Sequence, residues 1–183
     1  ELGTSNMMYM TSAVYNKKLR FWTAAKILAI CIFFNFFGAL VFSWLMSQTN
    51  AFNHLPADSY LFEAVSAKLA KTPWSQFIEG IFANIVVNTA VFCTLRMKDD
   101  AAKVISMIFI IFIFAFLGFE HVIANFVSFP LAFFANGGPV EGMNLWSVLS
   151  NFFFSGIGNY VGGGLVIGLL YSWLNKDSDV YVD

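Results

Sequence analysis

A glutamate and a histidine, Glu120 and His121, lie next to each other inside an apolar run that covers residues 104–136. They are the only ionisable residues of this run, which otherwise has the composition of a membrane-spanning segment. An ionisable side chain at such a depth is costly and predicts a functional site. His121 can donate a hydrogen bond in either protonation state and titrates near neutral pH, so it could bind an anion or transfer a proton.

The same run is too long for one perpendicular membrane helix. As a single helix it would reach roughly 50 Å at about 1.5 Å per residue, against about 30 Å of hydrocarbon. We therefore expect a break, with Gly118 as the weak point just before the pair. The helix that restarts there would present unpaired backbone N–H groups, which suit a small anion near the membrane midplane.

The composition of the whole chain is that of an integral membrane protein. Of its 183 residues, 58% are hydrophobic and 11% are charged, whereas roughly a quarter of the residues in a soluble domain are charged. The net charge of −1 argues against a nucleic-acid partner. Cys31 and Cys93 lie far apart in apolar segments without metal-ligand spacing, so we expect packing roles for them and no cofactor.

Polar stretches divide the chain into apolar segments of unequal length. The segments are 5–15, 27–47, 73–95, 104–136 and 144–175. The first is about half a membrane thickness long, and residues 61–72 form an amphipathic piece that we expect at the interface. The last segment is also too long for one perpendicular helix, and we expect it to bend at residues 155–158, Ser-Gly-Ile-Gly.

The basic residues predict an orientation. If the segments cross the membrane alternately, Lys68 and Lys71 are alone on one face. The lysines and arginines of the other face are Lys17, Lys18, Arg20, Lys26, Arg96, Lys98, Lys103 and Lys176. The positive-inside rule then predicts a multi-pass protein of the plasma membrane with a cytoplasmic C-terminus.

An internal repeat relates two of the segments. In each of them a tryptophan precedes an asparagine and then a glycine at the same offsets: Trp22, Asn35 and Gly38, then Trp146, Asn159 and Gly162. The two segments run in opposite directions, which indicates an inverted repeat, the architecture of many transporters and channels. We therefore predict an all-α membrane protein with three plus three helices. The chain, residues 1–183, would be one partial transmembrane domain that lacks the first helix and the start of the second.

The repeat also predicts a partner for the break at His121. The corresponding place in the first unit is residues 2–6, so we expect Thr4 to face His121 at midplane. The alternative for His121 is a structural role, bonded to Glu120 or to a backbone carbonyl, and the alternative for Glu120 is to orient a helix. Lys68 could attract anions to a mouth. Three asparagines could supply further donors or tie the breaks together: Asn84, Asn125 and Asn159.

Several longer motifs together resemble the formate/nitrite transporter family. The matching pieces are ELGTSNMMYMTSAV at the start, GIFANIVVNTAVF, GFEHVIANF, and GNYVGGGLVIGLLYSW. The resemblance covers nearly all of the chain, from within the second helix of the family to its sixth. It implies an aquaporin-like fold and a homopentamer in the lipid bilayer, with one pore in each protomer for small monovalent anions.

The resemblance also assigns roles to individual residues. His121 matches the central pore histidine, Thr4 the threonine of the discontinuous second helix, and Lys68 a lysine near the outer vestibule. Asn84 and Asn159 match asparagines beside the pore. The constrictions would be formed by Leu2 and Phe114, with Gly3 where many members of the family have an aromatic residue.

We therefore expect no enzyme but a channel or transporter for formate, nitrite or related weak acids, with proton coupling through His121. Hydrosulfide and lactate are alternative substrates within the same family. A non-transporting scaffold or a membrane redox subunit is an alternative of another class. Haem would need paired axial histidines, and only His121 lies in an apolar segment. A neutral-solute channel of the aquaporin type would carry an Asn-Pro-Ala signature, which this sequence lacks.

Overall fold

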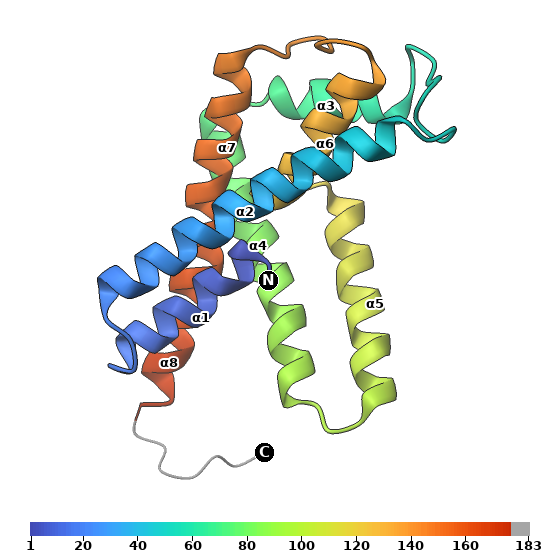
Figure 1. The fold of residues 1–183 in the computed structure, drawn as a ribbon. Coiled ribbons are helices and arrows are strands. Elements are labelled where there is room, and N and C mark those ends of the chain that lie inside the picture. The colour runs from blue at the N-terminus through green and yellow to red at the C-terminus, as the bar shows by residue number, and fades with distance from the viewer. Residues whose placement is uncertain (177–183) are drawn as a thin grey trace.

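The computed structural model describes residues 1–176, which form helices and no strand, as predicted (Figure 1). The predicted cytoplasmic C-terminus lies outside these residues. The elements are α1 (Gly3–Tyr15), α2 (Phe21–Ser47), α3 (Tyr60–Leu69), α4 (Pro73–Arg96), α5 (Asp100–Leu117), α6 (Val122–Ala135), α7 (Leu145–Asn159), the π-helix η1 (Tyr160–Leu169) and α8 (Leu170–Leu174).

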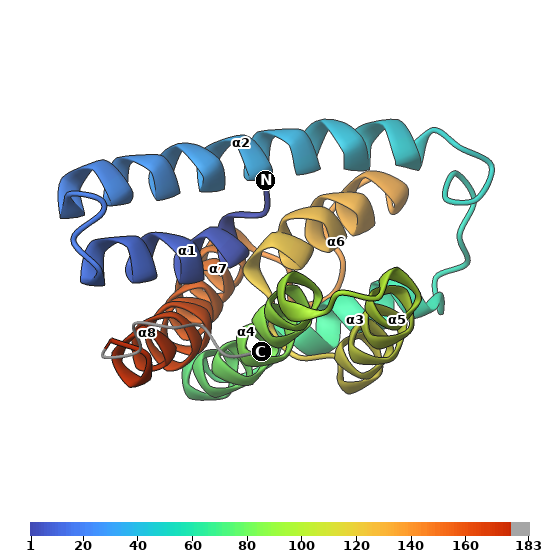
Figure 2. The same cartoon turned by 90° about the horizontal axis from the view of Figure 1, so that it is seen from below.

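Within the described residues, four helical stretches are long and apolar enough to cross a membrane. They are α2, α4, α5 and the continuous stretch Leu145–Leu174 that joins α7, η1 and α8. The helices α1 and α6 are shorter. They run in opposite directions from the centre of the molecule, both alongside α2 (Figure 2). Their N-terminal ends therefore come together inside the protein, which is the arrangement that a broken-helix site requires.

The break that the overlong apolar run predicts is present. Helix α5 ends at Leu117, and Gly118 adopts the left-handed conformation with φ +60°, which glycine reaches without steric cost. Helix α6 begins at Val122, with His121 in extended conformation as its N-cap. The ionisable pair thus occupies the non-helical link between two half-helices.

A close crossing of α4 with α7 supports the link from the opposite side. A Cβ atom at Gly80 would lie 2.8 Å from the carbonyl oxygen of Ser155, and one at Gly158 would collide with the carbonyl oxygen of Phe77. Because neither residue has a side chain, the two backbones come into direct contact. This contact brings the polar side chains of both helices to the break.

The predicted bend at residues 155–158 is wrong. Helix α7 continues through this stretch to Asn159, and the irregular winding follows it as the π-helix η1. Gly158 serves the crossing with α4 instead of a bend. In η1, a Cβ atom at Gly163 would collide with the side-chain amides of Asn84 and Asn88, so its glycine also permits close packing.

The crossing can be tested by adding a single methyl group. We expect Gly158→Ala to lower the melting temperature in detergent by about 3 to 10 °C, because the backbone of α4 cannot move away without opening the core. Gly38→Ala is the matched control, since no atom lies within 4 Å of a Cβ at Gly38 in α2. Equal melting temperatures for the two variants would contradict the tight crossing.

Candidate functional site

The starts of α1 and α6 meet through a buried hydrogen bond. The hydroxyl oxygen of Thr4 lies 2.9 Å from Nε2 of His121, and both residues are almost fully buried. Thr4 belongs to the first turn of α1, and His121 is the N-cap of α6. The structure therefore brings together the two residues that the repeat pairs.

The second ring nitrogen of His121 caps its own helix. Nδ1 accepts a hydrogen bond of 3.3 Å from the backbone N–H of Ala124. A nitrogen that accepts carries no proton, so the proton of the neutral imidazole lies on Nε2, towards Thr4. Protonation of Nδ1 would abolish the cap. The geometry thus favours a neutral His121 that donates from Nε2.

Asn159 holds the link before α6 by its backbone. Its side-chain amide donates to the carbonyl oxygens of Gly80 at 2.8 Å and of Glu120 at 3.0 Å, and its Oδ1 accepts from the N–H of Val122 at 2.8 Å. The carbonyl of Glu120 and the N–H of Val122 are groups that the break frees from helical hydrogen bonding, whereas Gly80 lies within α4. In an apolar surrounding each would be costly to leave unpaired, so Asn159 is a structural clamp.

Asn35 makes the equivalent bonds at the start of α1. Its Oδ1 accepts from the N–H of Gly3 at 2.7 Å, and its amide donates to the carbonyl oxygen of Glu1 at 2.9 Å. A side-chain bond is repeated as well. Asn6 donates to the carboxylate of Glu1 at 2.8 Å. In the second half the corresponding bond runs from Asn125 to Glu120, at 2.7 Å.

Two asparagines of α4 connect the two starts. The amide of Asn84 donates to the carbonyl oxygen of Asn159 at 2.6 Å and to that of Thr4 at 3.2 Å. Asn88, one turn further, donates to Oδ1 of Asn84 at 2.9 Å. Both are fully buried. The side-chain amides of Asn84 and Asn159 thus donate to backbone carbonyls of the protein itself. These bonds connect the two breaks.

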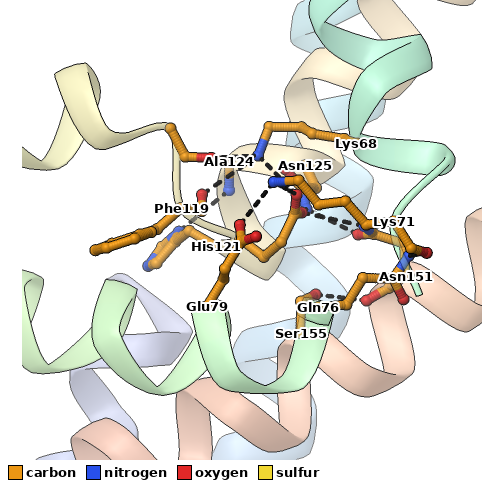
Figure 3. Close-up of polar contacts among 12 residues, drawn as sticks. Lys68, Lys71, Gln76, Glu79, Phe119, His121, Ala124, Asn125, Asn151 and Ser155 are labelled. Carbon is orange, nitrogen blue, oxygen red and sulfur yellow. Dashed lines mark hydrogen bonds and ion pairs between the residues drawn. The ribbon is translucent and has the colours of Figure 1, made fainter. Parts of the chain in front are cut away.

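Glu120 is a fully buried carboxylate that accepts from four side chains (Figure 3). Oε2 accepts from Asn125 at 2.7 Å and from Asn151 at 3.1 Å. Oε1 accepts from Lys71 at 2.8 Å and from Lys68 at 3.2 Å. A buried carboxylate needs this degree of pairing to remain ionised.

The two lysines differ in how firmly they are held. Lys68 also donates to the carbonyl oxygens of Gly118 and Phe119, at 3.4 and 3.3 Å. Burial lowers the pKa of Lys68, and the attraction of Glu120 offsets this only in part. Burial alone would lower the pKa of Lys71 too, but its hydrogen bonds to Glu120 and Glu79 outweigh burial and raise that pKa.

The residues predicted to form constrictions lie beside this site. The ring of Phe114 in α5 packs edge-on against the His121 ring, with centroids 5.5 Å apart. Leu2 is the N-cap of α1 and is 39% exposed. At Gly3, a Cβ atom would lie 3.1 Å from the side chain of Ile32. The absence of a side chain at Gly3 therefore lets α1 start close to α2.

Sequence reasoning missed three partners of this network. Lys71 was counted only for orientation, and Glu79 and Asn151 received no role. Spacing could have indicated one of them. Lys71 follows Lys68 by about one helical turn, which places the two side chains on the same face of a helix. Asn151 could not be found in this way, since only the fold brings α7 to Glu120. Within residues 1–176, no three His, Cys, Asp or Glu residues are grouped as a metal site would require.

Comparison with known families matches residues 1–173 to the family described as formate/nitrite transporter. The formate-nitrite transporter of Plasmodium falciparum (isolate 3D7) is 29% identical over 97% of this chain. The uncharacterized transporter YwcJ of Bacillus subtilis (strain 168) is 27% identical over 97% of this chain. The chain spans 59% and 68% of the lengths of these relatives.

A solved structure described as an FNT family ion channel has the same fold. Its TM-score is 0.81 at 23% sequence identity, and the match covers 95% of this chain and 69% of that chain. This similarity confirms the predicted fold class.

The clamp by Asn159 can be tested by stability. We expect Asn159→Ala to lower the free energy of unfolding by at least about 3 kcal/mol, because it leaves the buried backbone groups of Glu120 and Val122 without partners and removes the bond to Gly80. Thermal unfolding in detergent measures the loss. Asn16→Ala removes one exposed hydrogen bond, to the carbonyl of Ser12, and should change stability by less than about 0.5 kcal/mol. A similar small change for Asn159→Ala would rule out the clamp.

Proposed function

The chain belongs to the formate/nitrite transporter family, and we propose that it conducts small monovalent anions of weak acids, such as formate or nitrite. The family and the apolar helices make it a multi-pass membrane protein. The observation that carries the proposal is the buried hydrogen bond between Thr4 and His121, where two half-helices begin. This bond places two neutral donors and two helix N-termini at one point, a combination that suits a small anion.

Lys68 would attract the anion towards this point. Its ammonium lies at the link between α5 and α6, next to the carbonyl groups of Gly118 and Phe119. His121 follows two residues after Phe119 in the chain. An anion drawn to the lysine would therefore be close to the histidine. Thr4 and His121 would then exchange their mutual hydrogen bond for bonds to the anion.

Passage beyond the site would require loss of charge, because apolar side chains such as Phe114 and Leu2 flank it and a charge in apolar surroundings is costly. A weak acid can avoid this cost by taking up a proton. The proton of neutral His121 lies on Nε2, towards Thr4. We propose that a proton from the solution reaches the anion through His121, which takes up a proton at Nδ1 as it releases the one on Nε2, or through water polarised beside it, and that the substrate crosses as the neutral acid.

The proposal also covers the assembly of the protein, its orientation in the membrane and its substrate. We propose a homopentamer in the plasma membrane with the C-terminus on the cytoplasmic side, from the family resemblance and the distribution of basic residues. Hydrosulfide and lactate are alternative substrates, since both can also cross as neutral acids. The proposal from another class is a non-transporting membrane subunit. It is less favoured because it leaves the paired helix starts without a purpose.

Anion flux into proteoliposomes tests the function. We expect uptake of formate or nitrite, and we expect Thr4→Val to reduce it by roughly tenfold, because the isosteric side chain cannot donate to the anion. Hydrosulfide, lactate and glycerol complete the substrate panel. A protein that conducts none of the anions would be a non-transporting subunit, and one that conducts glycerol alone would be a neutral-solute channel.

The role of His121 is tested by His121→Asn. Asparagine keeps an N-cap acceptor and an amide donor but cannot titrate, so the fold should persist while the pH dependence of flux changes. We expect proton uptake with the anion to fall together with flux above neutral pH. Unchanged flux and unchanged pH dependence for all the anions would contradict the proton transfer.

A further inference from the structure

Four charged side chains meet at the link between α5 and α6, and one of the two lysines bridges the two carboxylates. Lys71 lies between two carboxylates, 2.8 Å from Glu120 and 2.6 Å from Glu79. Lys68 shares only the carboxylate of Glu120, at 3.2 Å. Figure 3 shows the two ammonium groups converging on this point from the side of α3.

The distances rank the two lysines as counterions of Glu120. A strong bond between an ammonium and a carboxylate measures about 2.7–2.9 Å, which the Lys71 bond satisfies and the Lys68 bond exceeds. The other bonds of Lys68 are longer still, and they go to carbonyl groups that carry no net charge. Glu120 is thus neutralised mainly by Lys71.

Glu79 fixes Lys71 in this position. Its Oε2 accepts from Lys71, and its Oε1 accepts from the hydroxyl of Ser75 one turn earlier in α4 at 3.0 Å. Glu79 and Lys71 are each about one-quarter exposed, whereas Glu120 is fully buried. An anchor at the protein surface therefore holds the ammonium that reaches the buried carboxylate.

We propose that Lys71, anchored by Glu79, is a positioning residue that neutralises Glu120 and thereby leaves the charge of Lys68 available to the entering anion. Without Lys71, Lys68 would be the only ammonium of residues 1–176 beside Glu120 and would form a tight pair with it. Such a pair has little attraction left for a third ion. This inference rests on the proposed anion conduction and concerns the affinity of the site.

Kinetics of anion flux separate this role from a simple effect of net charge. We expect Lys71→Met to raise KM for formate or nitrite by roughly three- to tenfold, with little change in maximal flux. Lys71→Arg should restore KM, because a guanidinium can bridge two carboxylates. Glu79→Gln releases the anchor of Lys71 and should also raise KM, whereas an effect of net charge alone would lower it.

The double variant Lys71→Met/Glu79→Gln decides between the two explanations. It has the same net charge as the parent, since one charge of each sign is lost. Under the proposal its KM stays raised, because Lys68 is still captured by Glu120. A return of KM to the parental value would show that net charge alone matters and would overturn the proposal.

Thermal unfolding tests the same ranking without any transport. Lys71→Met should lower the melting temperature by about 5 to 10 °C, because Glu120 loses its principal counterion, and Lys68→Met should lower it by less. Lys103→Met is the matched control. It breaks an ion pair with Asp100 at the surface, far along α5 from the break, and should have almost no effect.

A loss for Lys68→Met that equals or exceeds the loss for Lys71→Met would overturn the proposal. If the protein conducts no anion but Lys71→Met is the more damaging change, the proposed function fails while Lys71 remains the counterion of Glu120. The two failures are therefore distinguishable.

Discussion

The arrangement of this protein depends on one constraint, which is that a helix broken inside an apolar medium must find partners for its freed backbone groups. Water cannot supply them at that depth, so the protein itself must. Asn159 pairs two such groups at the link before α6, and Asn35 pairs two at the start of α1. The glycine crossing of α4 with α7 holds Asn159 at the link, because its amide also donates to the carbonyl oxygen of Gly80 where the two backbones touch.

The two helix starts share a clamp but differ in their charges. Each has an asparagine clamp and a glutamate that accepts from an asparagine five residues later, Glu1 with Asn6 and Glu120 with Asn125. At Glu120 two lysines are added from α3 and the turn after it. The sequence pattern of helix α3 is amphipathic, and its buried residues Val65 and Leu69 pack it against the core. Packing of α3 therefore determines where the ammonium groups reach.

Much of the fold and half of the site could be predicted from the sequence. The break near Gly118 follows from helix length and from an ionisable pair in an apolar run, both of which are local properties. The pairing of Thr4 with His121 followed from the repeat. The π-helix after Asn159 could not be predicted, because glycines of α7 and η1 permit close contacts with α4 and α1 and do not mark a local bend. Glu79 and Asn151 likewise depend on which helices lie side by side.

The charge balance at Glu120 is compatible with the proposed anion path, although it includes a buried carboxylate. A pore must attract its ion strongly enough to admit it and weakly enough to release it. Two unopposed lysines in a half-buried site would hold an anion, and a lone buried glutamate would repel it. With Lys68, Lys71, Glu79 and Glu120 together the net charge is zero, so attraction comes only from how the charges are arranged. The longer bonds of Lys68 and the shorter bonds of Lys71 create that arrangement, so in the proposed site it is distance, and not the count of charges, that would set affinity.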